Sequence, residues 1–212
     1  MGRALIGRLL QNGHTVAALA RPASVPKLPA GCKPVPGDAL DSGAYTLDGA
    51  GTQVHLVGVA HPAPSKAKQF RGIDLASTLA AVRAAERARV RHFIYVSVAH
   101  PAPVMHAYIA ARTEAEEAIR AAGLNATILR PWYVLGPGHR WPLALLPAYW
   151  VLRQIPATRD NARRLALLTL GQMTEALVGA VENPAEGCRI LEVPDIAASF
   201  KGSRKVACGG FL

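Results

Sequence analysis

Short apolar segments alternate with longer amphipathic segments along most of this chain, and this alternation constrains the fold more than any other feature. A short run of apolar, β-branched or aromatic residues predicts a strand buried on both faces, whereas apolar residues at every third or fourth position predict a helix. Strands are expected at 15–20, 33–35, 53–59, 92–97 and 126–130, and helices at 1–11, 70–89 and 105–122. This order predicts an α/β fold with a doubly wound parallel sheet covered by helices on both faces.

The pattern loosens after Pro131. Residues 143–155 are apolar and expected to be helical around Pro147, but this segment is too short and too broken to span a bilayer. The sequence further predicts a loop at 132–141, a strand at 162–168, a helix at 171–181 with Thr169 as its N-cap, and a strand at 188–193. We interpret residues 1–194 as one domain, in which 131–194 includes a small C-terminal lobe, and residues 195–212 as a loose tail.

The charge balance bears on the partners of the protein. Its 24 Lys and Arg residues against 14 Asp and Glu give a formal net charge of +10. Such an excess suits nucleic acid, an anionic membrane surface or phosphorylated ligands. Because the positive residues are scattered and lack interleaved aromatic residues, we do not expect a nucleic-acid partner.

The cysteines and histidines bear on compartment and metal binding. The three cysteines have no Cys-x-x-Cys spacing, which predicts a reduced, cytoplasmic protein. The first ten residues contain Arg3 and Arg8 and no cleavage site, so no signal peptide is expected. The histidines show no metal-ligand spacing, and no metal site is expected.

A candidate reactive site follows the strand at 92–97. Ser97 ends this strand, and Tyr108 and Arg112 lie four residues apart on the next helix, so both side chains point from one helical face. Ligands of open α/β sheets bind at the carboxyl edge of the strands. A hydroxyl, a phenol and a cation at that edge are candidates for an active site. The alternative is a serine in a turn and two half-exposed helical residues.

Several short stretches, in their order and spacing, resemble a known family. They are residues 2–10, 14–21, 37–38, 54–60, 92–97, the pair Tyr108-x-x-x-Arg112, and 125–131. Together they cover roughly residues 2–194 and are similar to the atypical, extended-type short-chain dehydrogenases/reductases, in particular their NmrA-like and complex I accessory subunit-like branch. The resemblance implies a Rossmann-like fold whose small C-terminal lobe holds the substrate.

The beginning of the sequence departs from the pattern of that family. There a TGxxGxxG loop joins the first strand to the first helix and holds the pyrophosphate of the dinucleotide. Gly2 resembles the last glycine of this loop, whereas the other two glycines and the strand before them are not in the sequence. We therefore expect a sheet without its central strand, with an ordinary N-terminal glycine as the alternative interpretation of Gly2.

The resemblance implies further contacts with a cofactor. Arg21 stands where an acidic residue would bind the NAD ribose, which implies a preference for NADP(H), with NAD(H) as the second cofactor. Asp38, followed by Ala39, would accept a hydrogen bond from the adenine amino group. The remaining implied contacts are Val59, Ala60, Tyr108, Arg112 and Pro131. The simpler alternatives are a solvated arginine, an Asx turn at Asp38 and plain strand packing.

The resemblance also implies catalytic roles. Tyr108 would exchange the proton, Ser97 would polarise a carbonyl, and Arg112, which replaces the lysine of the family, would support the tyrosine and hold the nicotinamide ribose. The first hypothesis is an NADP(H)-preferring oxidoreductase that acts on a carbonyl or alcohol of an unknown small molecule. The second is a non-catalytic NAD(P)H-binding redox sensor or a respiratory or assembly accessory protein. A third is a weak membrane-surface or protein contact through residues 141–155.

Acidic residues follow Arg112 on the same predicted helix. Glu116 and Arg120 have the i, i+4 spacing of a helical ion pair. We expect Glu114, Glu116 and Glu117 to form a solvated face.

Overall fold

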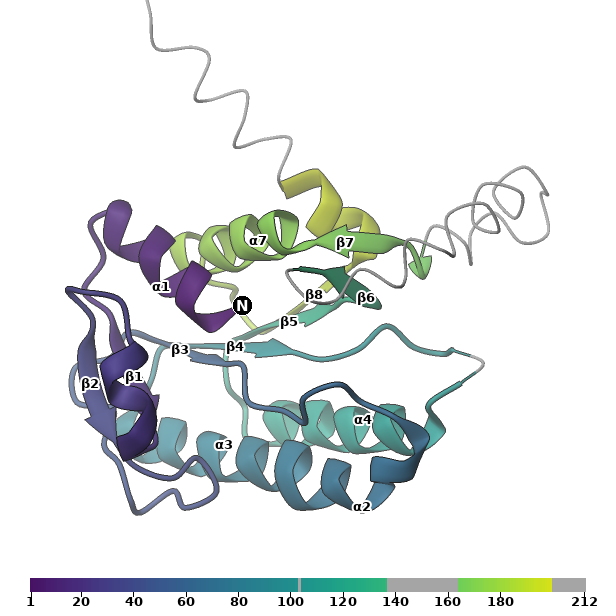
Figure 1. Ribbon diagram of the computed structural model, residues 1–212, viewed down its shortest axis with the longest axis horizontal. Coiled ribbons are helices and arrows are strands. Elements are labelled where there is room, and N and C mark those ends of the chain that lie inside the picture. The colour runs from purple at the N-terminus through teal and green to yellow at the C-terminus, as the bar shows by residue number, and fades with distance from the viewer. Residues whose placement is uncertain (103, 137–163, 200–212) are drawn as a thin grey trace, which may run out of the picture.

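The computed structural model describes residues 1–102, 104–136 and 164–199. In this part a parallel sheet lies between two layers of helices (Figure 1). The elements in chain order are α1 (Gly2–Gln11), β1 (Ala17–Ala20), η1 (Pro22–Lys27), β2 (Lys33–Pro36), β3 (Thr52–His55), η2 (Pro64–Lys66), α2 (Ala67–Gln69), η3 (Phe70–Leu75), α3 (Ala76–Ala88), β4 (His92–Val96), α4 (His106–Ala121), β5 (Ala126–Arg130), β6 (Tyr133–Leu135), β7 (Leu167–Thr169), α7 (Leu170–Glu182) and β8 (Cys188–Glu192). The predicted α/β class with a parallel sheet is confirmed.

The strands form three parallel groups. The largest has the order β3-β4-β5-β8, and its register pairs Val54 with Ile94 and Tyr95 with Ile128. Strands β1 and β2 form a second pair, and β6 and β7 a third. Within the described residues, β1 and β3 share no sheet hydrogen bonds, so each of them has one edge without a partner strand.

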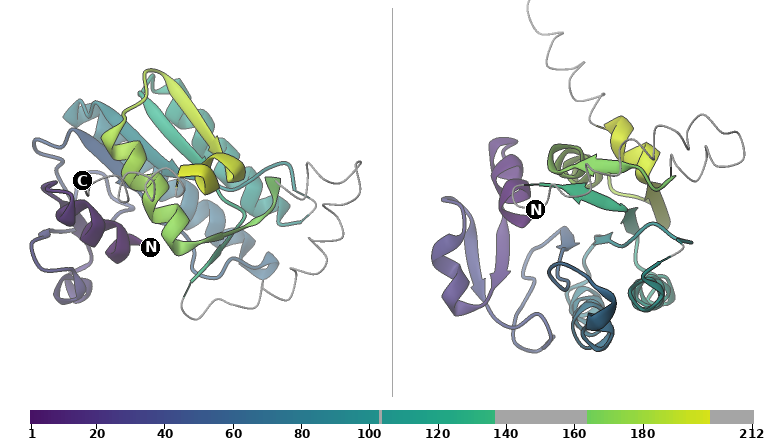
Figure 2. Two further views of the ribbon diagram at one scale, coloured as in Figure 1. Left: turned by 90° about the horizontal axis from the view of Figure 1, so that it is seen from above. Right: turned by 45° about the vertical axis from the view of Figure 1, so that its right-hand side comes forward.

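Successive side chains of each strand point to opposite faces of the sheet and build two separate cores. On one face, Phe93, Tyr95 and Ile128 pack against α3 and α4. On the other, Ile94 and Leu129 pack against α1, α7 and the helical residues 193–199. The views in Figure 2 show these two layers on either side of the strands.

Helices α1 and α7 lie side by side over the second core. Leu5 and Leu9 of α1 are buried there together with residues of α7, and Arg8 bonds Glu175 of α7 at 3.0 Å. The predicted N-cap of α7 is confirmed, because the Thr169 hydroxyl accepts the amide of Gln172 at 3.2 Å. The packing of α1 places Gly2 beside the end of β3, where an added Cβ would lie 3.9 Å from Leu56.

Some boundaries differ from the sequence-based expectation. Strand β3 ends at His55 and not at residue 59, because its pairing with β4 ends at His55 and Tyr95. Residues 133–135 form β6 inside the expected loop. The expected loose tail from Asp195 is wrong up to residue 199, since Val193 and Ile196 lie one helical turn apart and are buried against α7. The apolar segment 143–155 lies outside the described residues.

The helices of the described part are short or carry charged residues. None of them combines the length and the apolar character that a membrane crossing requires.

Candidate functional site

Helix α4 directs a row of functional side chains at the sheet. Tyr108, Arg112 and Glu116 follow one another at intervals of four residues and therefore share one helical face. Arg112 and Glu116 are buried in spite of their charges, with 6% and 0% exposure. Burial of a charge is costly without a partner, so the partners of these two residues define the chemistry of the site.

The Arg112 guanidinium links the end of β4 to the neighbouring segment η3. Its Nη1 donates to the carbonyl of Val96 at 2.7 Å and to the Tyr95 hydroxyl at 3.3 Å. Its Nη2 donates to the carboxylate of Asp74, which is fully buried on η3. Among the described residues its Nε, although buried, has no hydrogen-bond partner. One donor of this cation is therefore left for a further acceptor.

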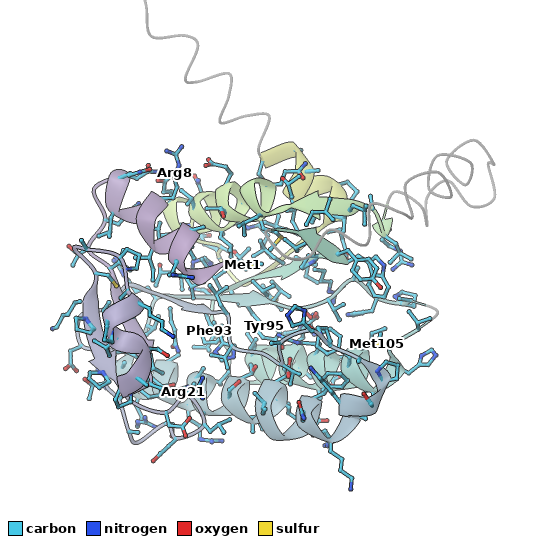
Figure 3. All side chains as sticks on the ribbon, viewed as in Figure 1. Met1, Arg8, Arg21, Phe93, Tyr95 and Met105 are labelled. Atoms are coloured by element: carbon cyan, nitrogen blue, oxygen red, sulfur yellow. The ribbon has the colours of Figure 1, made fainter. Side chains whose placement is uncertain are left out.

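Aromatic rings surround the same cation. The guanidinium carbon lies 5.6 Å from the centre of the Tyr95 ring and 5.1 Å from that of Tyr108, and the Tyr108 ring packs against Phe70 at 4.9 Å. Figure 3 shows Tyr95 at the centre of the molecule, between the sheet and the layer of α3 and α4. We call Arg112, Asp74, Tyr95 and Tyr108 the Arg112 cluster. The sequence-predicted pair of Tyr108 and Arg112 is thus in contact.

Asp74 is a member of this cluster that the sequence analysis missed. Its second carboxylate oxygen accepts the amide of Val59 at 3.1 Å, so Asp74 also fixes the segment that follows β3. A carboxylate on the inward face of an otherwise apolar helix was the available signal, because Asp74 lies four residues after the buried Phe70.

Gly58 is required by this arrangement. A Cβ at this position would overlap the Arg112 guanidinium and would lie 3.0 Å from Asp74. Only glycine therefore allows the backbone after β3 to approach the buried ion pair.

The environment of Tyr108 favours the neutral phenol. Burial raises the pKa of Tyr108 above its ordinary value; the Arg112 cation lowers it, and the Asp74 carboxylate raises it again. The net pKa is raised, so the Tyr108 phenol is protonated at neutral pH.

Ser97 contacts Glu116, whereas the sequence suggested that it lies beside Tyr108 and Arg112. Its hydroxyl donates to Glu116 at 2.6 Å, and Glu116 lies two helical turns from Tyr108, about 12 Å along the helix. The contacts of the described part thus link Ser97 to Glu116 and not to Tyr108. Sequence reasoning placed both at one sheet edge but could not give the direction of the hydroxyl.

The prediction that Glu116 lies on a solvated face is wrong, because its side chain is fully buried. Its two oxygens accept from Arg130 at 3.0 and 2.6 Å and from Arg120 at 2.8 Å, and Arg130 also bonds Glu192 of β8 at 3.0 Å. Burial alone would raise the pKa of Glu116, but the hydrogen bonds from Arg130 and Ser97 outweigh burial and the pKa is lowered. We call Glu116, Ser97, Arg120, Arg130 and Glu192 the Glu116 cluster. The i, i+4 pair of Glu116 and Arg120 is confirmed.

The residues predicted to bind a cofactor lie along the carboxyl ends of the strands. Arg21 is exposed directly after β1, on the β1–β2 side of the molecule (Figure 3). Asp38 is exposed after β2 and accepts the amide of Leu40 at 3.0 Å, which is the Asx turn considered above. Ala39 is half-buried, Val59 and Ala60 follow β3, and Pro131 is buried after β5, where its carbonyl accepts the amide of Ala99 at 2.9 Å.

A family model described as NAD(P)H-binding matches residues 1–139, which is more than half of the chain. This chain belongs to the NAD(P)H-binding family. The cofactor of this family is a nicotinamide dinucleotide, which agrees with the resemblance found in the sequence.

Relatives of this NAD(P)H-binding chain include a protein named ceramide reductase, from Caulobacter vibrioides. The two are 28% identical over 151 residues, which make up 70% of this chain and 45% of the relative. The chain therefore spans less than half of the length of that relative.

Solved structures share the fold of this NAD(P)H-binding chain. MoeE5 in complex with UDP-glucose and NAD superposes with a TM-score of 0.65 at 19% identity, over 96% of this chain and 78% of that one. A short-chain dehydrogenase/reductase superfamily protein from Agrobacterium tumefaciens with bound NAD gives 0.65 at 20% identity, over 99% and 80%. At these identities the likeness concerns the fold, and it agrees with the predicted Rossmann-like architecture.

The described residues fit the dinucleotide of this NAD(P)H-binding family. Gly58 brings backbone close to the buried Arg112, whose Nε is a buried donor that bonds none of the described residues. The first amides of α1 lie beside the end of β3 and carry the positive end of a helix dipole, which suits a phosphate. These features lie at the carboxyl edge of the strands, where dinucleotides bind in such sheets.

Proposed function

We propose that this chain is an NADP(H)-preferring reductase domain that acts on the carbonyl group of a small molecule. The observation that carries this proposal is the contact of Tyr108 with the buried Arg112 beside Gly58 and Val59. It joins a protonated phenol to a cation at the edge where the nicotinamide of this family lies. The name of the relative from Caulobacter, a reductase, supports the direction of the reaction.

The proposed roles follow from the chemistry of each side chain. When bound, the reduced nicotinamide supplies a hydride to the carbonyl carbon. The Tyr108 hydroxyl donates its proton to the carbonyl oxygen, so that the C=O bond becomes CH–OH, and water returns the proton to the phenolate. Arg112 supports the charge that develops on Tyr108 and offers its Nε to the nicotinamide ribose. Ser97 acts as a polarising group only when its hydroxyl leaves Glu116.

The remaining contacts with the cofactor are proposed along the strand ends. Arg21 accommodates the 2′-phosphate of NADP(H), because it is an exposed cation at the end of β1 and no acidic residue lies beside it. Gly2, Asp38, Ala39, Val59, Ala60 and Pro131 complete the proposed cofactor site.

Cofactor binding tests the first part of the proposal. Titration of the protein with NADPH, followed by nicotinamide fluorescence, is expected to saturate. Arg21→Ala should weaken NADPH binding more than NADH binding, whereas Lys27→Ala, at the other end of η1, should change neither. Equal losses for both cofactors in Arg21→Ala would remove the claim on the 2′-phosphate, and no saturable signal with either cofactor would overturn the proposal.

Turnover tests the second part. Turnover is measured with a panel of ketones and aldehydes and, separately, with ceramide, an amide that the name of the relative mentions. On any substrate that is turned over, Tyr108→Phe should lower kcat/KM by about 100-fold or more while NADPH still binds. Turnover by Tyr108→Phe at the unaltered rate would exclude this phenol as the proton donor.

A second function is favoured by one observation. Both terminal nitrogens of Arg112 already bond protein groups, which leaves this cation less free than a lysine to serve a reacting substrate. We therefore also propose a non-catalytic NAD(P)H-binding sensor or accessory role. Saturable NADPH binding without turnover of any carbonyl in the panel would select it.

A further inference from the structure

We propose that Asp74 is a positioning residue that, through Arg112, keeps Tyr108 a protonated phenol and so commits this site to donating a proton. The inference rests on the proposed function and adds to it a residue and a direction of proton transfer. It starts from the geometry of the buried ion pair and not from the resemblance to a family.

The Arg112 cation exerts an electrostatic field on the Tyr108 ring. An isolated cation 5.1 Å from the Tyr108 ring would stabilise the phenolate strongly in a buried site. Here the cation bonds a fully buried carboxylate, so that the pair presents a much smaller net charge to the phenol. The field of Asp74 therefore opposes that of Arg112 at Tyr108 and offsets part of it.

Three further rings lie around the contact between Tyr108 and Arg112. Phe70 of η3 covers one side of the ring with an apolar surface. Tyr95 of β4 shares the Arg112 cation, and His55 of β3 packs beside Tyr95 at 6.0 Å between ring centres. Burial and the Arg112 cation lower the pKa of His55 to about 3, so it adds no charge at neutral pH. Asp74 is thus the carboxylate within the cluster that opposes Arg112.

The Asp74 carboxylate is held in place by two hydrogen bonds. Asp74 uses one oxygen for Arg112 and the other for the amide of Val59, so it cannot turn away without releasing the segment after β3. The geometry of the pair is therefore fixed from two elements. Reduction of a carbonyl needs the protonated phenol, and oxidation of an alcohol needs the phenolate. An Asp74 held in this way favours the first at neutral pH.

Titration of Tyr108 tests this inference without any turnover. The signal of Tyr108 is isolated as the difference in tyrosinate absorbance between the protein and Tyr108→Phe, or as the chemical shift of the ring carbon that bears its hydroxyl. Asp74→Asn, which is isosteric, should move the midpoint of this titration to lower pH, because Arg112 then acts alone. The basic limb of the pH profile of reduction should move in the same direction.

Glu114→Gln is the matched control. Glu114 is a carboxylate on α4, the helix of Tyr108 and Arg112. It pairs at 3.0 Å with Arg71 of η3, but its side chain is 46% exposed. Its removal should leave the Tyr108 titration in place, because water screens its field. An unchanged or raised midpoint in Asp74→Asn, or an equal shift in Glu114→Gln, would overturn the inference.

A second pair of variants serves if Asp74→Asn does not fold because Arg112 is left unpaired. Arg112→Gln retains Asp74, and Asp74→Asn combined with Arg112→Gln removes both charges. The double variant should titrate at lower pH than Arg112→Gln, and equal midpoints would refute the role of Asp74. A protein that binds no dinucleotide would end the proposed function, but these titrations would still decide the electrostatic role of Asp74.

Discussion

Helix α4 carries two buried clusters of charged residues one turn apart. They differ in how many of the hydrogen-bonding atoms of the central side chain, Glu116 or Arg112, have partners. Glu116 accepts hydrogen bonds on both oxygens from Ser97, Arg120 and Arg130, so its bonding capacity is used within the protein. Arg112 has one carboxylate partner, two neighbouring rings and a buried Nε without a partner in the described part. Similar burial therefore goes with two different arrangements. The Glu116 cluster joins α4 to β5 and β8, whereas the Arg112 cluster retains a donor that we propose to serve the cofactor.

Removal of the Glu116 charge should have the largest effect. Glu116→Gln leaves Arg130 without its buried carboxylate, and the free energy of unfolding should fall by about 3–5 kcal/mol. Urea denaturation followed by circular dichroism measures the change. Glu117→Gln, at the next and exposed position, is the control. A loss in Glu116→Gln no larger than that of the control would show that this cluster does not hold the helix.

Arg112→Lys should have a smaller effect. Lysine keeps the positive charge but cannot bond Asp74 and the Val96 carbonyl with a planar fork. We expect a loss of about 1.5–3 kcal/mol in the free energy of unfolding, the usual value of a hydrogen bond to a charged group. The same denaturation measurement applies, with Arg71→Lys as the control. An unchanged stability would mean that the fork of Arg112 is not needed to join β4 to η3.

His55, which packs beside Tyr95 of the Arg112 cluster, should make the stability of the fold sensitive to acid. The folded pKa of His55 is lowered from 6.5 to about 3 by burial and by Arg112, so below pH 6.5 the unfolded chain binds a proton that the folded chain does not. The free energy of unfolding should therefore decrease as the pH falls below 6.5, by up to about 1.4 kcal/mol per pH unit for this one group.

Denaturation of the protein and of His55→Gln at several pH values between about 6.5 and 4.5 measures the contribution of His55. The difference in stability between the two should change steadily in favour of the variant as the pH falls. His106→Gln, on the exposed first turn of α4, is the control. Parallel stability curves for the protein and His55→Gln would contradict the neutral, buried state of His55.

The smallest effect is expected at the surface. Arg71 and Glu114 join η3 to α4 as Asp74 and Arg112 do, but their side chains are 65% and 46% exposed. Arg71→Ala should change the melting temperature little, since solvent-exposed ion pairs contribute only about 0–1 kcal/mol to stability. A large drop in the melting temperature would mean that the contrast between buried and exposed pairs does not apply to this interface.

Sequence patterns could predict the order of the elements because each strand and helix carries a local signal. The apolar residues of β4 and β5 and the capping residue Thr169 required no knowledge of distant contacts. The contact between Tyr108 and Arg112 was predictable for the same reason, since four residues on a helix fix their relative direction.

The partners of the buried charges could not be predicted in this way. Glu116 looked like a solvated residue because Arg130 lies 14 residues further along the chain, and Asp74 meets Arg112 only after two elements pack together. Helical spacing from Tyr108 to Glu116 placed both on one face, but it could not say which side of the helix faces the sheet.

The unpartnered edges of β1 and β3 have a consequence for the handling of this protein. Strands β1 and β3 each present backbone amides and carbonyls that no neighbouring strand in the described part covers. Such edges act as templates on which another chain can add a strand. Concentrated solutions of this polypeptide should therefore associate edge to edge, and its amide protons along β1 and β3 should exchange with solvent sooner than those of β4 and β5, which are paired on both sides.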